Sequence, residues 1–384
     1  MHSFLVALTL LAAIFWILNT LDVALGLPRL KHLSGVSPLE DVKCPTVSIL
    51  FAARDEAEKL PDALETLLAL DYPNYEVVAV NDRSEDGTHE ILDGAARSEP
   101  RLKVVHISSL PGGWLGKPHA LQQGHEHASG EWLVFTDADV HFSRDLLRRV
   151  VALAQREKWD HLTLLGRVEM HNPGERIALT FVAMAFLLGI RPWWVSNPQS
   201  PFYAGIGAFQ LIRRSAYEAI GAHRRLAMEV VDDMKLGKLV KEAEFRSGVA
   251  NSGDTVRVRW HAGVGNIVRG TTKNFFAASG FRLWVSCTQV LGLLWMFVLP
   301  LVALPFLNGW AFVFALIAVG MPVLTEGGVA LEFGISPLYA LTFPIGALIL
   351  AWMLARSTIV TLWSGGITWR GTFYPLEELK RGVV

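Results

Sequence analysis

Charged residues are distributed very unevenly along this chain. Residues 4–27 carry only Asp22, and residues 283–325 and 333–355 carry no charged side chain. A helix needs roughly 20 apolar residues to cross the hydrocarbon core of a membrane. We therefore predict one N-terminal span and three C-terminal spans, because residues 283–325 can hold two helices joined by a turn at residues 308–309.

In the intervening part of the chain, residues 29–282, the apolar runs are shorter than those of the predicted spans, and they alternate with segments of helical periodicity. Runs that suit buried strands are separated by segments with apolar residues at helical spacing. Strands that alternate with helices in this way indicate a doubly wound, mostly parallel α/β sheet. The expected strands are residues 46–53, 75–80, 102–107, 132–135, 162–168 and 205–211.

Acidic residues follow three of the expected strands directly. Asp55 and Glu56 follow the first, Asp82 follows the second, and Asp137 and Asp139 follow the fourth. Ligands of open α/β sheets bind beyond the carboxyl ends of the strands, so we expect these side chains to line one crevice. Along an extended strand end Asp137 and Asp139 would point the same way and suit a hard divalent cation that also holds phosphate oxygens. Any single acid could instead cap the next helix.

Composition narrows the classes of partner. The formal net charge of −1 gives no basic surface for nucleic acid, and mean hydropathy of +0.33 reflects the long apolar stretches. The chain lacks the glycine-rich fingerprints of dinucleotide-binding and phosphate-binding loops. Nucleotide binding would therefore rest on carboxylates and a metal. Two cysteines, Cys44 and Cys287, do not imply a disulfide framework.

These patterns divide the chain into an N-terminal transmembrane anchor (1–28), a globular domain (29–282) and C-terminal transmembrane helices with a tail (283–384). Residues 177–195 are apolar and end in tryptophans, which suits an interfacial segment, although a buried helix is the alternative. Basic residues directly after the first span place the globular domain in the cytoplasm of an integral membrane protein.

The side of the membrane on which the C-terminus lies stays open from sequence. Three complete C-terminal crossings would place Val384 outside. Four basic residues near the last span favour the inside instead, and the last apolar stretch could re-enter rather than cross. These residues are Arg356, Arg370, Lys380 and Arg381.

Four short motifs carry a family resemblance. They are Ala-Arg-Asp-Glu-Ala (53–57), Asn-Asp-Arg-Ser-Glu-Asp-Gly-Thr (81–88), Gly-Trp-Leu-Gly-Lys (113–117) and Thr-Asp-Ala-Asp (136–139). With them, the chain resembles membrane-integrated family 2 glycosyltransferases of the glycosyltransferase-A fold. Its pattern is similar to that of hopanoid-associated and carotenoid-acid glycosyltransferases and, more distantly, of ceramide glucosyltransferases. Many such relatives have Asn where this chain has Asp55.

The resemblance implies a role for each residue of the donor site. Asp82 would contact the nucleobase, Glu56 the nucleoside, Lys117 the nucleotide, and Asp137 the sugar or ribose. Asp139, with Asp137, would hold Mg²⁺ or Mn²⁺, and a metal there offsets the charge that grows on the leaving nucleotide. Asp55 would belong to the same nucleotide site, with its contact left open by the departure from Asn.

Two further places concern the acceptor and the diphosphate. The catalytic base of the family maps onto the adjacent carboxylates Asp232 and Asp233, and Asp233 is the preferred assignment. Two adjacent carboxylates repel each other, which can raise one pKa and give a better base. Arg259 and Trp260 match only the end of a longer family motif, in which Arg would hold the diphosphate and Trp would face the acceptor. A plain strand edge is the alternative for them.

The function expected from the sequence is inverting transfer of one sugar from a nucleotide-sugar, a UDP-sugar by resemblance, to a membrane lipid. Two alternatives remain. One is a processive polysaccharide synthase, and the other is a catalytically inactive membrane scaffold of the same fold. Uncharged spans and the incomplete motif at Arg259 argue against a channel for a growing polymer.

Overall fold

The computed structural model describes residues 2–384, and their contacts divide them into two compact units. The helical unit comprises the described residues through Arg29, Met170–Arg191 and Trp260–Ile367. The sheet unit comprises Leu30–Glu169, Pro192–Arg259 and Thr368–Val384. This grouping differs from the continuous domain over residues 29–282 expected from sequence, since two of its segments pack with the apolar helices.

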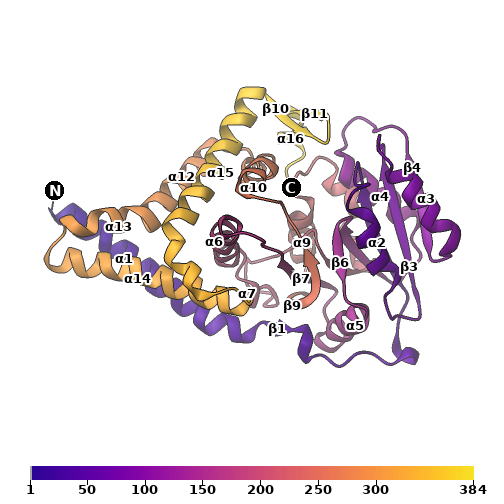
Figure 1. Cartoon of the computed structure of the whole chain (residues 1–384), viewed down its shortest axis with the longest axis horizontal. Helices are drawn as coiled ribbons and strands as arrows, with labels where there is room; N and C mark the ends of the chain where they lie inside the picture. Colours follow the sequence, from indigo (N-terminus) through magenta and orange to yellow (C-terminus); the bar gives the residue numbers. More distant parts are fainter. Residues whose placement is uncertain (1) are drawn as a thin grey trace. The chain divides into compact units, whose positions relative to one another are not determined.

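The sheet unit contains the doubly wound, mostly parallel sheet that the sequence predicts. Among the described residues nine strands form it, in the order β1-β9-β7-β8-β5-β2-β3-β4, with β6 paired to β9. Figure 1 labels several of these strands, among them β3 and β4. β8 runs antiparallel to both neighbours, and β6 is antiparallel to β9. The strands are β1 (Lys31–His32), β2 (Val47–Ala53), β3 (Tyr75–Asp82), β4 (Leu102–Ile107), β5 (Trp132–Asp137), β6 (Val140–Phe142), β7 (His161–Val168), β8 (Gln210–Arg213) and β9 (Ser247–Val258).

The strands that carry the acidic residues are direct neighbours. β2 lies between β3 and β5 and is parallel to both. In this register Ala53 pairs with Asn81, and Ala52 pairs with Asp137. The carboxyl ends of the three strands therefore lie at one edge of the sheet, where an α/β fold places its ligands.

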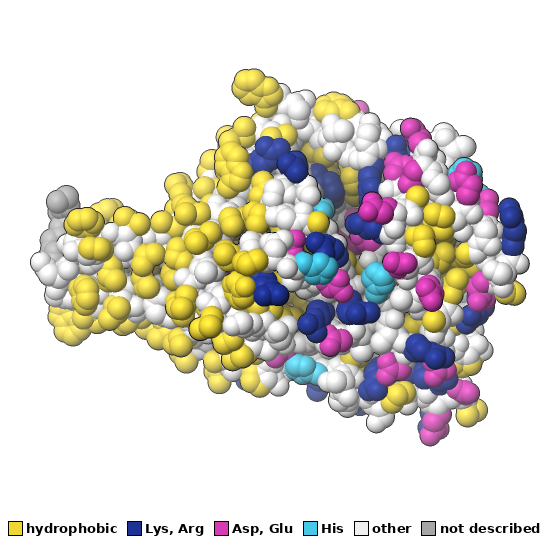
Figure 2. Space-filling model, viewed as in Figure 1, with side chains coloured by type: hydrophobic (Ala, Val, Ile, Leu, Met, Phe, Trp, Pro, Cys, Tyr) yellow, Lys and Arg dark blue, Asp and Glu magenta, His cyan; other side chains and the backbone are white. Residues whose placement is uncertain are grey.

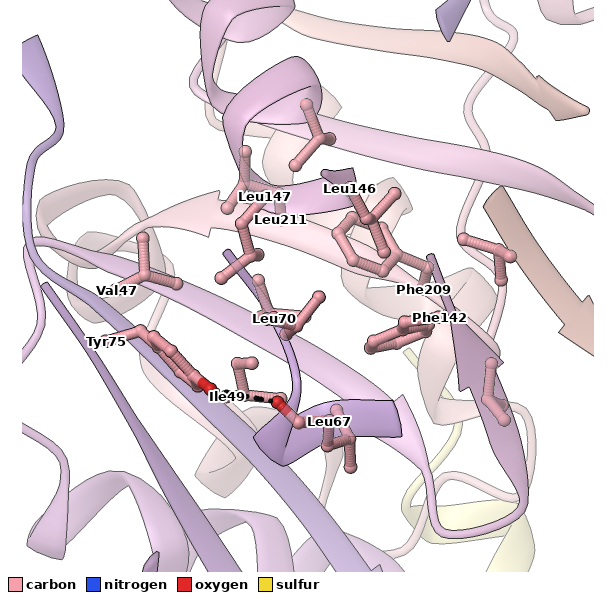
Figure 3. Packing of buried hydrophobic residues seen from close by; sticks show 14 of the residues in the cluster. Val47, Ile49, Leu67, Leu70, Tyr75, Phe142, Leu146, Leu147, Phe209 and Leu211 are labelled. Carbon is pink, nitrogen blue, oxygen red and sulfur yellow. Dashed lines mark hydrogen bonds between the residues drawn. The ribbon is translucent and has the colours of Figure 1, made fainter. Parts of the chain in front are cut away.

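Helices cover both faces of this sheet, as the periodicity predicts. One face carries a core in which Ile49, Leu67, Phe209 and Leu211 are fully buried or nearly so (Figure 3). Each such side chain contributes about 1.5–3 kcal/mol relative to an exposed one. The helices of this unit are α2 (Leu60–Leu68), α3 (Thr88–Ser98), α4 (Gly116–His127), α5 (Leu146–Glu157), α7 (Pro192–Val195), α8 (Arg214–Ala219) and α9 (Asp232–Glu242).

The end of the chain belongs to the sheet unit, which the sequence analysis did not anticipate. After the last long helix the chain forms a two-stranded hairpin, β10 (Gly366–Trp369) and β11 (Thr372–Pro375), followed by α16 (Leu376–Arg381). We call residues Thr368–Val384 the C-terminal tail. Arg370 and Gly371 connect the two strands, and both have left-handed backbones, as tight hairpin turns require.

Among the residues described, five helices are long and apolar enough to cross a membrane, and all but the last four residues of the second belong to the helical unit. They are Ser3–Arg29, Pro173–Val195, Leu283–Phe306, Gly309–Glu332 and Pro337–Ser364. Figure 2 shows hydrophobic side chains over the outer surface of several of these helices. The helices within the unit are α1 (His2–Gly26), α6 (Pro173–Ile190), α10 (Val264–Gly270), α11 (Asn274–Ala278), α12 (Leu283–Leu293), α13 (Leu299–Ala303), α14 (Gly309–Glu332) and α15 (Phe343–Ser364), with a π-helical stretch at Leu294–Val298.

One N-terminal and three C-terminal apolar helices are confirmed, with two changes of boundary. α6 begins at Pro173, four residues before the expected segment, because Asn172 caps it through a 2.9 Å hydrogen bond from the Glu175 amide. α15 extends to Ser364, past the uncharged run, so it includes Arg356. Its end is set by Gly365, which adopts a left-handed backbone.

Candidate active site

Asp137 and Asp233 meet around Lys117. The ammonium group of Lys117 donates to Asp137 at 2.6 Å, and the amide of Gly207 donates to Asp233 at 2.8 Å. A methyl group on Gly207 would lie 2.8 Å from Asp137, 3.1 Å from Asp233 and 3.3 Å from Lys117. The three predicted site residues therefore surround one glycine, whose missing side chain leaves room for them.

The electrostatics of this cluster favour a protonated lysine and a basic aspartate. Burial alone would lower the pKa of Lys117, but Asp137, Asp232 and Asp233 together raise it above its usual value. Burial and the neighbouring Asp232 carboxylate raise the pKa of Asp233, whereas Lys117 opposes the rise. A carboxylate with a raised pKa accepts a proton more readily near neutral pH.

The two adjacent aspartates at the start of α9 have different surroundings. The Asp232 side chain is 4% exposed and lies 3.8 Å from the ring of the equally buried His223. Asp233 is only partly buried and accepts a hydrogen bond from the Met234 amide at 2.8 Å. The Asp233 carboxylate thus lies with Asp137 around Gly207, which supports its assignment as base.

Asp139 belongs to a separate group. β5 ends at Asp137, and Ala138 and Asp139 form a turn, so the expectation of an extended strand end is wrong there. The turn directs Asp139 to Lys59, with 2.9 Å between ammonium and carboxylate. Burial alone would lower the pKa of Lys59, but Asp139 and Glu56 raise it.

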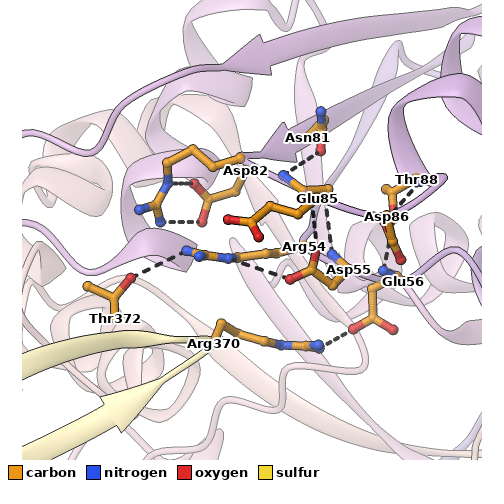
Figure 4. Close-up of polar contacts among 12 residues, drawn as sticks. Arg54, Asp55, Glu56, Asn81, Asp82, Glu85, Asp86, Thr88, Arg370 and Thr372 are labelled. Atoms are coloured by element: carbon orange, nitrogen blue, oxygen red, sulfur yellow. Dashed lines mark hydrogen bonds and ion pairs between the residues drawn. The ribbon is translucent and has the colours of Figure 1, made fainter.

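Asp82 is already paired within the described structure. Arg83 donates two hydrogen bonds to its carboxylate, at 2.7 and 3.0 Å, and the Asp82 side chain is 5% exposed (Figure 4). Gly116 approaches so closely that a methyl group on it would lie 2.5 Å from the same carboxylate. The Gly116 amide in turn donates to the Tyr374 hydroxyl of the C-terminal tail at 3.3 Å. Any contact with a nucleobase would therefore involve Asp82 and Arg83 together.

Asp55 connects the loops after β2 and β3. Its carboxylate accepts from the Glu85 amide at 2.8 Å, and its own amide donates to the Ser84 hydroxyl at 3.1 Å. Its φ of 53° lies in the left-handed region, which Asn and Asp tolerate better than most residues. Asp55 therefore tolerates the left-handed backbone of this position, as the Asn of many relatives would.

Glu56 contacts the C-terminal tail. Arg370 at the hairpin tip forms an ion pair with the Glu56 carboxylate, and Arg54 donates to the Thr372 hydroxyl at 3.4 Å (Figure 4). Burial raises the pKa of Glu56, although Arg370 opposes the rise. The tail thus contacts the loop that the sequence assigns to the nucleoside.

Arg259 and Trp260 directly follow β9, and they fall on opposite sides of the division between the two units. Trp260 stacks on His261, with 5.6 Å between ring centroids. The roles of Arg259 at the diphosphate and Trp260 at the acceptor stay predictions.

The carboxylates suit a hard cation but do not form a complete metal site. Among the described residues no group of three His, Cys, Asp or Glu side chains could hold a metal ion. Asp137 and Asp139 offer the oxygen ligands that Mg²⁺ and Mn²⁺ prefer, and Mg²⁺ is commonly held by one or two carboxylates plus substrate phosphates. The donor set fits a cation that arrives with a diphosphate.

Three residues of this edge were missed by sequence reasoning. Lys59 follows the Asp55–Glu56 pair by three positions, and Gly207 lies in a Gly-Ile-Gly segment. Arg370 precedes a glycine between two runs of aromatic and β-branched residues, which is a usable hairpin signal. The contact between Arg370 and Glu56 links positions more than 300 residues apart, which local patterns do not reveal.

The mostly parallel sheet, with carboxylates at the ends of β2, β3 and β5, has the architecture of the glycosyltransferase-A fold. Residues 48–221 match the family model described as "Glycosyl transferase family 2". This part of the chain is a glycosyl transferase family 2 domain.

Two curated relatives resemble this chain over about two thirds of its length. The chain is 28% identical over 291 residues to beta-monoglucosyldiacylglycerol synthase of Trichormus variabilis, a match that covers 68% of this chain and 58% of that protein. It is 24% identical over 256 residues to 4,4'-diaponeurosporenoate glycosyltransferase of Staphylococcus haemolyticus, covering 65% of this chain and 66% of the relative. The chain thus spans less than two thirds of the first relative's length.

Among solved structures, the chain is similar to the mannosyltransferase PcManGT from Pyrobaculum calidifontis, whose structure is a complex with GDP-Man and Mn²⁺. The TM-score is 0.58 at 19% identity, and the match covers 94% of this chain and 99% of the other. This likeness confirms the fold.

Proposed function

We propose that the protein is an inverting glycosyltransferase that moves a single sugar from a UDP-sugar to a lipid acceptor in the membrane. The observation that carries this proposal is the cluster of Asp137, Asp233 and Lys117 around Gly207. It brings a candidate base with a raised pKa beside the first aspartate of the Asp-Ala-Asp motif. The two curated relatives, both named for glycosyl transfer to lipids, support the acceptor class.

In this reaction Asp233 takes the proton of the acceptor hydroxyl as its oxygen attacks the anomeric carbon. The bond from that carbon to the diphosphate breaks on the opposite face, and the nucleotide leaves with the bonding electrons. Lys117 keeps Asp137 in place and balances the negative charge of the cluster. A base with a pKa near the operating pH is best suited to such a transfer.

In this proposal the donor binds at the edge of the sheet formed by the carboxyl ends of β2, β3 and β5. Glu56 and Asp55, with the Asp82–Arg83 pair, form the nucleoside side of the site, and Arg259 and Trp260 are proposed for the diphosphate and the acceptor. Asp139 and Asp137 would hold Mg²⁺ or Mn²⁺ together with the diphosphate. A divalent cation there supplies Lewis-acid stabilisation of the leaving diphosphate. Lys59 must release Asp139 for this to occur.

The apolar helices support the proposed acceptor class and a location in the membrane. Five helices could cross a membrane, and basic residues follow the first of them. We place the sheet unit in the cytoplasm, where nucleotide-sugars are made, with the acceptor drawn from the adjacent lipid. The proposal retains an N-terminal anchor (1–28), an interfacial segment (177–195) and C-terminal helices in the membrane.

Mass spectrometry of lipids from cells with and without the protein tests this proposal. We expect one lipid class to gain a single hexose when the protein is present, and to lose it with the Asp233→Asn variant. A size-distributed glycan would indicate a processive synthase instead. Unchanged lipids in cells that accumulate the folded protein would indicate an inactive scaffold.

A further inference from the structure

Three non-glycine residues with left-handed backbones lie in the loops of one sheet edge. They are Asp55 (φ 53°), Arg83 (φ 56°) and Arg370 (φ 48°), and they come from the ends of β2 and β3 and from the tip of the C-terminal hairpin. Figure 4 shows Asp55 and Arg370. Arginine has no local hydrogen bond that relieves this conformation. Such strain persists where surrounding structure enforces it, and it gathers at functional sites.

Arg370 occupies a turn that favours other residues. A two-residue hairpin turn with both backbones left-handed prefers Asn-Gly or Asp-Gly, whereas this chain has Arg-Gly. The guanidinium of Arg370 contacts Glu56, yet its side chain is 46% exposed, against 13% for Glu56. Arg370 therefore pairs with Glu56 through its guanidinium and still exposes part of its side chain at the edge of the candidate donor site.

Charges near the Arg370 tip are balanced in pairs. Arg370 pairs with Glu56, and Lys59 pairs with Asp139. The two pairs interact, since Glu56 and Arg370 both contribute to the electrostatic environment of Lys59. A divalent cation bound to a sugar nucleotide brings two positive and two negative charges. The metal on Asp139 and a diphosphate beside Arg370 would therefore keep this group neutral.

We propose that Arg370 is a donor-binding residue whose guanidinium binds the diphosphate of the sugar nucleotide, so that the C-terminal hairpin forms one wall of the donor site. This inference rests on the proposed function. The planar fork of arginine donors matches phosphate oxygens better than an ammonium group does. Glu56 holds the fork near the site before the donor arrives.

Holding the tail in place does not require Arg370. Thr372 accepts from Arg54, and the Tyr374 hydroxyl accepts from the Gly116 amide. At the end of the tail, the Val384 amide donates to Glu229 at 3.1 Å, and Lys235 donates to the Val384 carbonyl. The hairpin should therefore remain docked when the Arg370 side chain is shortened.

The test uses the purified full-length protein in nanodiscs with Mn²⁺ and compares the binding of UDP with that of uridine by calorimetry. Arg370→Gln removes the charge and the fork, and Arg370→Lys keeps only the charge. Lys380→Gln is the matched control, because Lys380 lies in the same tail and pairs only locally with Glu377 at 2.9 Å. We expect Arg370→Gln to weaken UDP binding by at least ~10-fold, as for a lost charged hydrogen bond. Uridine binding and the control should be unchanged, and Arg370→Lys should be intermediate.

Equal UDP affinity of wild type and Arg370→Gln would overturn the inference, and so would an equal loss of UDP and uridine binding, which indicates a structural role.

A second experiment uses the unmodified protein, so that its result does not depend on whether a variant folds. Trypsin should cleave after Arg370, and UDP with Mn²⁺ should slow this cleavage while uridine does not; equal cleavage with UDP and with uridine would contradict the inference. If the wild type bound no UDP at all, the proposed UDP-sugar donor would fail first, and the inference with it.

Discussion

At the scale of single residues, the contrast between Asp232 and Asp233 makes a direct prediction. Asp233→Asn should lower transfer by about 10²–10⁴-fold, the usual contribution of a general base, while UDP binding stays within a few-fold of wild type. Turnover and UDP affinity of the purified variant check this. Asp232→Asn is the comparison, and an active Asp233→Asn beside a folded but inactive Asp232→Asn would exchange the two assignments.

The pH dependence of transfer should report the same carboxylate. Burial and Asp232 raise the pKa of Asp233, and a base works only when deprotonated, so activity should fall as the pH drops through this raised pKa. The acid limb of kcat/KM should therefore lie above the value of about 3.9 for an unperturbed aspartate. A profile that stays flat down to that value would show that Asp233 is not the titrating base.

Asp139 tests the role of the metal. Asp139→Asn keeps the shape of the side chain but removes the charge that would bind the cation and that now pairs with Lys59. Transfer should fall by at least ~10²-fold, as when a major electrostatic contact to the transition state is lost. Assays with and without a chelator measure this, and full wild-type activity in excess chelator would exclude the metal.

At the scale of helices and strands, local pattern predicted the sheet and its acidic edge well. Short apolar runs ending near Asp55, Asp82 and Asp137 sufficed to locate β2, β3 and β5, because strands buried on both faces are apolar throughout. The turn at Asp139 and the pairing of Arg370 with Glu56 could not be predicted in this way. They depend on tertiary contacts that override the local pattern.

The segment around α6 and α7 makes a prediction about the acceptor. Trp194 is partly exposed in α7, and Trp260 follows β9, so both suit contact with an amphiphile. Trp194→Ala or Trp260→Ala should weaken lipid use more than hydrolysis of the sugar nucleotide. Rates with lipid and with water as acceptor measure this, and Trp310→Ala, in the first turn of α14, is the control. An equal loss of both reactions would contradict an acceptor role.

At the scale of the whole molecule, the grouping of the chain constrains its path through the membrane. Glu169 and Pro192 flank α6 and both belong to the sheet unit, so a single crossing by α6 would place one compact unit on both sides. Arg259 and Thr368 also belong to that unit. We therefore expect the intervening helices to make an even number of complete crossings, which, of the two possibilities left open by the sequence, favours a re-entrant stretch over three crossings.

The C-terminus should accordingly lie in the cytoplasm with the sheet unit. The basic residues Arg29, Lys31, Lys380 and Arg381 then all lie on the inner side, as the positive-inside rule favours. A tag after Val384 should resist external protease in intact cells and be cleaved once they are permeabilised. Cleavage in intact cells would show that the tail lies outside.

The central claim is single-sugar transfer to a lipid at the edge formed by β2, β3 and β5. Its most direct test is to incubate the purified protein in nanodiscs with a radiolabelled UDP-sugar and a lipid acceptor, and to weigh the product by mass spectrometry. The account predicts a lipid heavier by one hexose, absent with Asp233→Asn. A long glycan of distributed size, or the same product from Asp233→Asn, would contradict it.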